Sequence, residues 1–223
     1  MTPPLAAVAE AHRTLSRALA SLTDADVAGP SLLPGWTRGH VLAHVADAAR
    51  ARSRVVEHAL RGEVVGMWEP GERDAIIEAT AGRTADEHRA AVTENADRLE
   101  RAWAAVADWS ASGGFASAVV IRWREVWIHL VDLDVGVRPA AWPVDFSCHA
   151  VDFLRTRLPD GFAVRAVDSR GEGHVETPRL RVGGVEISGS VHDLAAWLAG
   201  RAPDEPPVSA VPLPELGPWP SYR

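Results

Sequence analysis

Residues 33–46 read LPGWTRGHVLAHVA and decide how the chain folds, because they contain the clearest helix start in the sequence. Thr37 is placed to cap this helix, since a threonine hydroxyl can accept a hydrogen bond from the first free backbone N–H groups. The pattern that follows predicts a long helix through residues 59–60, with a stop near Gly62.

Helical periodicity recurs on both sides of this segment. Apolar residues spaced mostly three, four or seven apart predict an amphipathic helix over residues 4–22. Further helices are predicted over residues 72–79, 85–106 and 119–135. Four long helices with polar connections predict a helical bundle of roughly 140 residues.

The pattern changes after Pro143 to shorter elements. These are a helix at residues 146–158, alternating stretches at residues 162–167, 180–182 and 185–189, and a capped helix at residues 191–198. Glycine and proline residues separate the alternating stretches and predict hairpin turns. We therefore predict an α+β protein with a helical bundle over residues 1–142 and a small α+β domain over residues 143–223.

Composition excludes several classes of function. The net charge of −7 offers no basic stripe for nucleic acid. No stretch approaches the roughly 20 apolar residues of a membrane span, and the N-terminus has no signal-peptide pattern. We therefore expect a cytoplasmic protein, and a monomer. The single Cys148 excludes an intramolecular disulfide, and the sequence contains no lysine for Schiff-base chemistry.

Two His/carboxylate patterns indicate a metal site with nitrogen and oxygen ligands. Glu125 and His129 are four residues apart and project from one face of a helix, as do His40 and His44. One histidine of the second pair would complete a His₂Glu set with an open fourth position. Such pairs also arise by chance, and His40 can equally cap or pack near its helix start. The apolar run at residues 126–128 favours burial, and a buried carboxylate needs a positive partner.

The segment 33–46 resembles the second-helix signature of the mycothiol-dependent maleylpyruvate isomerases. Residues 124–129, REVWIH, followed by VDL at residues 131–133, are similar to the family's fourth-helix signature. A third resemblance, to the C-terminal segment of the family, covers residues 187–201. The resemblance spans nearly the whole chain in the same order and spacing.

This resemblance implies a DinB-like four-helix bundle that carries the metal, followed by a small domain similar to sterol-carrier folds. It places the zinc ligands on His44, Glu125 and His129, and the catalytic arginine on Arg201. His40 occupies a neighbouring position that is not a ligand in the family. By itself, Arg201 would be interpreted as a cation at a helix C-terminus, an interaction of about 0.3–1 kcal/mol.

The implied reaction converts maleylpyruvate to its trans isomer, fumarylpyruvate, in gentisate-type aromatic degradation. Mycothiol, as its thiolate, adds to the double bond, the resulting single bond rotates, and elimination restores the alkene. Zinc would lower the pKa of the thiol, and Arg201 would bind a substrate carboxylate and stabilise the developing charge.

Five further residues are weaker candidates. Asp47 and Asp132 each follow a predicted ligand by three residues and can accept its distal N–H, although a solvated surface acid is favoured for Asp47. Arg38, Arg122 and Arg124 can line the mouth of the bundle and bind carboxylates, or form surface pairs.

Two other functions fit the same residues. A mycothiol S-transferase would use zinc and thiol on another electrophile, although such transferases often lack the second domain and Arg201. A non-catalytic binding module would use a structural metal, or none, and a metal in it would be held by four ligands rather than three.

Overall fold

The structure is a computed structural model, and it describes residues 3–109, 115–167 and 184–220. The chain divides into two compact units, Met1–Val137 and Arg138–Arg223. The boundary predicted from sequence, at 142/143, falls a few residues later in the chain. The α+β class is confirmed, because the first unit is helical and the second contains a small sheet. Within the described residues, no helix is long and apolar enough to cross a membrane.

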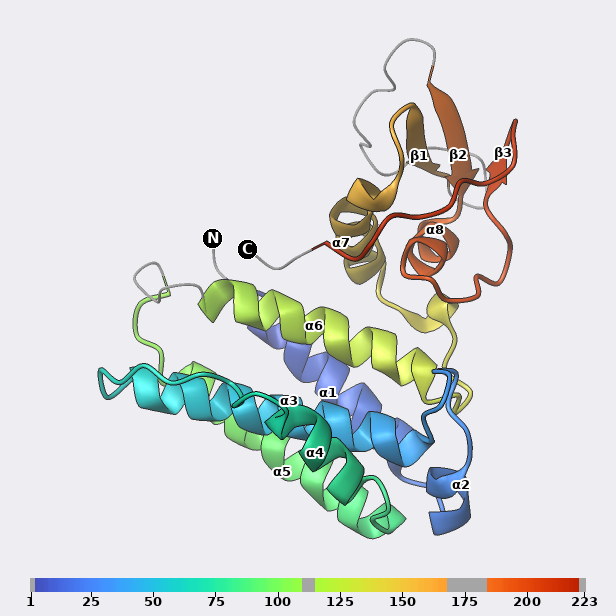
Figure 1. Cartoon of the computed structure of the whole chain (residues 1–223). Helices are drawn as coiled ribbons and strands as arrows, with labels where there is room; N and C mark the ends of the chain where they lie inside the picture. Colours follow the sequence, from blue (N-terminus) through green and yellow to red (C-terminus); the bar gives the residue numbers. More distant parts are fainter. Residues whose placement is uncertain (1–2, 110–114, 168–183, 221–223) are drawn as a thin grey trace. The chain divides into compact units, whose positions relative to one another are not determined.

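The first unit is built on four long helices, shown in Figure 1: α1 (Leu5–Leu19), α3 (Arg38–Ala59), α5 (Ala85–Ala104) and α6 (Phe115–Asp132). Two short helices, α2 (Asp24–Ala28) and α4 (Glu72–Thr80), lie between them in sequence. Helix α3 packs on α4, α5 and α6, and α1 packs on α5 and α6. The predicted bundle is therefore confirmed, whereas α2 was not predicted.

Local chemistry fixes where these helices begin. Thr23, Thr37 and Thr84 each cap a helix, with the hydroxyl accepting from the backbone N–H three residues later. At α3 the cap is reciprocal, because the ring Nδ1 of His40 accepts from the backbone N–H of Thr37 at 3.2 Å. The cap predicted at Thr37 is thus present, and His40 belongs to it.

A tight turn leads into α3. The backbone N–H of Trp36 donates to the carbonyl of Leu33 at 3.1 Å, and Gly35 between them has a φ of 80°. Glycine adopts this left-handed conformation without steric cost, and proline before it favours the turn. The turn determines where Trp36 lies next to the start of the helix.

The core of the bundle consists of small and aliphatic residues with a few large side chains. Leu15, Leu42, Leu99, Trp103 and Leu130 are each at most 1% exposed. Burying a side chain of this size contributes about 1.5–3 kcal/mol relative to leaving it in water. These contacts hold the helices together and support the polar groups buried among them.

The second unit comprises α7 (Val144–Leu154), β1 (Phe162–Ala166), β2 (Val185–Gly189), α8 (Val191–Leu198) and β3 (Val208–Ser209), with short 3₁₀ turns at Pro139–Ala141 and Arg155–Arg157. Strand β2 lies between β1 and β3. Ser190 caps α8, as predicted, and Gly200 follows its end with a φ of 71°.

The predicted pairing of the strands needs a correction. Two successive hairpins would place the predicted stretch at residues 180–182 between residues 162–167 and 185–189. Instead, β1 and β2 pair directly with each other and in parallel, from Phe162↔Val185 to Ala166↔Gly189. The stretch predicted at residues 180–182 lies outside the described residues.

Gly39 allows α3 and the end of α4 to approach each other. A Cβ at this position would lie 2.1 Å from the backbone oxygen of Ala81, whereas a Cβ at Gly82 would have nothing within 4 Å. We expect Gly39→Ala to lower the free energy of unfolding by about 1–3 kcal/mol, because overpacking outweighs the better helix propensity of alanine. Urea denaturation measures this, with Gly82→Ala as control. Equal stability of the two variants would contradict the close approach.

Candidate functional site

Helices α3 and α6 bring His44, Glu125 and His129 together. The Nε2 atom of His44 lies 3.5 Å from Oε1 of Glu125. The rings of His44 and His129 meet edge to face, with their centroids 4.8 Å apart. Glu125 and His129 come from one face of α6, and His44 reaches them from α3. The two helix motifs singled out in the sequence therefore meet in one cluster.

The carboxylate of Glu125 is balanced by two guanidinium groups. Arg122 and Arg52 donate to Oε2 of Glu125 at 2.8 and 2.9 Å. Burial alone would raise the pKa of Glu125, but Arg52, Arg122 and His44 favour the charged form and hold the pKa below its usual range. Glu125 is therefore an ionised carboxylate, with Oε1 on the side of His44.

His44 is a neutral imidazole in this cluster. Burial lowers its pKa from 6.5 to about 3, and Glu125 opposes this shift only in part. Its Nδ1 atom lies 3.5 Å from Nη2 of Arg73, and the ring of Trp36 lies 6.0 Å from its ring. A neutral imidazole has a lone pair available to bind a cation.

His129 is oriented by a carboxylate. Its Nδ1 lies 2.9 Å from Oδ2 of Asp132, which is 1% exposed, so the predicted contact with this aspartate is present. Because a carboxylate accepts, Nδ1 carries a proton, and the nitrogen that can bind a cation is Nε2. Metal-binding histidines commonly have such a partner.

These donors match the chemistry of a divalent cation of the zinc type. Two ligands of one tetrahedral zinc ion, each at about 2.0–2.1 Å, lie about 3.3 Å apart. The distance of 3.5 Å between His44 and Glu125 is close to this value. As the side chains stand, no group of three or more His, Cys, Asp or Glu residues in the described part of the chain forms a ready metal-binding set. The residues thus fit a cation chemically, although they do not form a preassembled three-donor set.

A line of hydrogen bonds runs behind Glu125 into the bundle. The Nε atom of Arg122 donates to Nε2 of His12 at 3.0 Å, and Nδ1 of His12 lies 2.7 Å from Oε1 of Glu100. Arg122 is fully buried and His12 is 4% exposed. Sequence reasoning named Arg122 only as a possible carboxylate binder at the bundle mouth and missed His12 and Arg52. Only their helical spacing on α1 and α3 could have indicated that they face inward.

Other candidate residues have different roles. Asp47 is 5% exposed and accepts from Trp68 Nε1 at 2.7 Å and Arg50 Nε at 2.6 Å, so the preference for a solvated acid was wrong. Arg38 donates to the backbone carbonyls of Leu133 and Asp134, which follow the end of α6. Arg124 is buried.

Arg201 belongs to the second unit. Its Nη1 donates to the carbonyl of Ala199 at 2.6 Å, just after the end of α8. Arg157 also donates to a carbonyl there, that of Leu198, and burial, together with the proximity of Arg201, lowers the pKa of Arg157. Two guanidinium groups therefore gather at the C-terminal end of α8.

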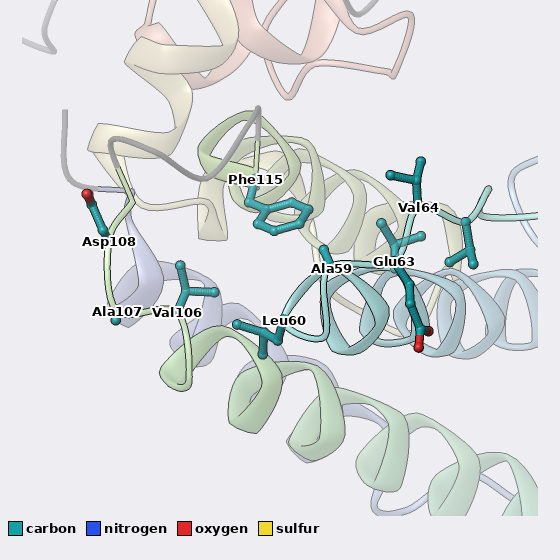
Figure 2. A pocket seen from close by; sticks show the side chains of 10 residues that line it. Ala59, Leu60, Glu63, Val64, Val106, Ala107, Asp108 and Phe115 are labelled. Carbon is teal, nitrogen blue, oxygen red and sulfur yellow. The ribbon is translucent and has the colours of Figure 1, made fainter.

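Two surface pockets lie apart from the cluster. Figure 2 shows the first, of 460 Å³, with Ala59, Leu60, Val106 and Phe115 among its largely apolar lining. The second, of 550 Å³, is lined partly by His40. Neither lining includes His44, Glu125 or His129.

Comparison with known proteins now identifies the class. Residues 8–134 match the family described as "Mycothiol maleylpyruvate isomerase N-terminal domain". The chain is similar to the crystal structure of the mycothiol-dependent maleylpyruvate isomerase and to that of its histidine-to-alanine mutant, each with a TM-score of 0.76 and 26% identity. Each match covers 96% of this chain and 99% of the other. No curated protein matches.

A helical bundle followed by a small α+β unit is thus the architecture of an enzyme family. Because the match covers more than half of the chain, the protein belongs to the mycothiol maleylpyruvate isomerase family.

Two buried histidines outside the cluster make the stability of the metal-free bundle sensitive to pH. Burial lowers the pKa of both His12 and His88 below 6.5. The unfolded chain therefore binds protons first, so the free energy of unfolding should fall as the pH drops below about 6.5.

Urea denaturation of the metal-free protein between pH 7 and 5.5 measures this loss. His12→Gln should make the dependence shallower, because it removes one of the three histidines, His12, His44 and His88, whose pKa is lowered by burial. An unchanged slope in this variant would contradict the assignment.

Proposed function

We propose that the protein is a zinc- and mycothiol-dependent isomerase that converts maleylpyruvate to fumarylpyruvate. The observation that carries the proposal is the convergence of His44, Glu125 and His129 in a chain that matches an enzyme of this name over 96% of its length. The match extends through the second unit, which favours the isomerase over a transferase built from the bundle alone.

In this proposal His44, Glu125 and His129 hold the cation. Each neutral imidazole offers a lone pair to the cation, and Glu125 supplies one negative charge. Because zinc takes four ligands, three protein ligands leave one coordination position open. A divalent cation in such a site lowers the pKa of a thiol that binds to it, which makes the thiol nucleophilic at neutral pH. The nucleophile is then the thiol of mycothiol. Cys148 is not required, and partial burial raises the pKa of its own thiol.

Arg201 is proposed to bind a carboxylate of the substrate. A guanidinium group can hold a carboxylate through two parallel hydrogen bonds and stabilise negative charge that develops nearby. Addition of the thiolate to a double bond conjugated with a carbonyl places charge on the carbonyl oxygen. Rotation about the new single bond and loss of the thiolate then give the trans product.

Turnover tests the proposal directly. Purified protein of known metal content is mixed with maleylpyruvate and mycothiol, and formation of fumarylpyruvate is followed. Zinc binding without turnover would favour a mycothiol S-transferase acting on another electrophile. Absence of stoichiometric metal and of turnover would favour a non-catalytic binding module.

His44→Ala should lose zinc and activity together, because it removes one of three protein ligands. Metal analysis and the isomerase assay on the same sample measure both effects. His58→Ala, on the same helix, is the control and should retain both. A His44→Ala protein with full zinc content would exclude His44 as a ligand.

Arg201→Ala should retain zinc and lose turnover by about 100- to 1000-fold, the usual cost of removing one group that stabilises developing charge. Arg155→Ala removes an arginine of the same unit that pairs with Asp152, and serves as the control. Wild-type kinetics in Arg201→Ala would refute the proposed catalytic role.

A further inference from the structure

The structure assigns to Arg52, Arg122, His12 and Glu100 a positioning role: they orient Glu125 so that it binds the cation through Oε1 alone. This inference rests on the proposed function, because it concerns how the metal ligand is held. None of the four residues was expected from sequence to act on Glu125.

The two oxygens of Glu125 have different partners. Nη1 of Arg122 and Nη1 of Arg52 both donate to Oε2. Each of these atoms also donates to a carbonyl of α3, Arg122 to Val45 at 2.9 Å and Arg52 to Ala48 at 3.1 Å. Oε2 is therefore held against the backbone of α3, while Oε1 lies beside Nε2 of His44.

His12 and Glu100 in turn fix the guanidinium of Arg122. Since Nε of Arg122 is always a donor, Nε2 of His12 must accept and its Nδ1 must carry the proton, which it donates to Glu100. Burial keeps His12 neutral by lowering its pKa. The chain of contacts from Glu100 to Glu125 has only one consistent arrangement of protons, so the plane of the guanidinium is set.

Binding through one oxygen matters for the open site. A carboxylate that binds a small cation through both oxygens occupies two coordination positions, and one of them would be lost to the thiol. With Oε2 committed to Arg52 and Arg122, Glu125 occupies a single position.

Metal binding by the whole protein tests this role independently of activity. Zinc affinity is measured by competition with a chromophoric chelator, and cobalt(II) in place of zinc reports the coordination number through its visible absorption. Arg52→Met should weaken zinc binding by about 10- to 100-fold, as is usual when a partner of a ligand is removed. Its cobalt bands should also become weaker, because Oε2 of Glu125 then keeps only the hydrogen bond from Arg122 and can more readily join Oε1 on the cation.

Arg52→Lys retains a donor and should recover most of the loss. Arg98→Met is the matched control, because Arg98 pairs with Glu57 between α5 and α3, away from Glu125. It should leave zinc affinity and the cobalt spectrum unchanged. Zinc affinity and the cobalt spectrum are also compared between His12→Leu and His12→Gln. This pair tests the hydrogen bond from Arg122 to His12, since the amide oxygen of glutamine can replace the acceptor at Nε2 and leucine cannot.

Four outcomes are decisive. A folded Arg52→Met protein with wild-type zinc affinity and a wild-type cobalt spectrum would overturn the positioning role. Tighter zinc binding by this variant would also overturn it, because the guanidinium of Arg52 would then only repel the cation. If Arg52→Met does not fold, zinc affinity and the cobalt spectrum of the two His12 variants decide. Equal values for His12→Leu and His12→Gln would overturn the positioning role. A wild-type protein that binds neither metal would overturn the proposed metal site itself, and this result is distinct from failure of the variants.

Discussion

A buried carboxylate that must remain charged constrains the whole bundle. The side chain of Glu125 lies between α3 and α6 with 11% of its surface exposed, and its negative charge is stable there because two guanidinium groups donate to it. Removing one partner of such a buried pair costs about 3–5 kcal/mol, because the remaining charge has no compensation. The same contacts tie α6 to the backbone of α3 and, through His12, to α1.

The start of α3 sets where His44 lies along the bundle. The turn at Leu33–Trp36 and the cap at Thr37 begin the helix, and His44 follows two turns later. The absence of a side chain at Gly39 lets this first turn lie against the end of α4. Local sequence chemistry thus positions His44, and the buried ion network positions Glu125.

Much of this was predictable from sequence, and the rest fails for identifiable reasons. Caps and helical periodicity predicted the four long helices, and the spacing of Glu125 and His129 placed both on one face of α6. Asp47 was misjudged because its partner Trp68 lies in a loop whose path no periodicity indicates. Arg52 and His12 were missed because ion pairs between helices leave no local pattern. The direct pairing of β1 with β2 was missed because turn residues do not indicate which strands, separated in sequence, pair with each other.

The enclosure of Arg122 has a consequence for spectroscopy. Its Nε–H is 0% exposed and donates to an imidazole inside the bundle, so solvent protons reach it only when the helices separate. In a nitrogen-15 NMR spectrum the Nε–H resonance of Arg122 should persist where those of surface arginines are broadened by exchange. The rate at which this N–H exchanges with solvent therefore reports how often the bundle opens, without any attached probe.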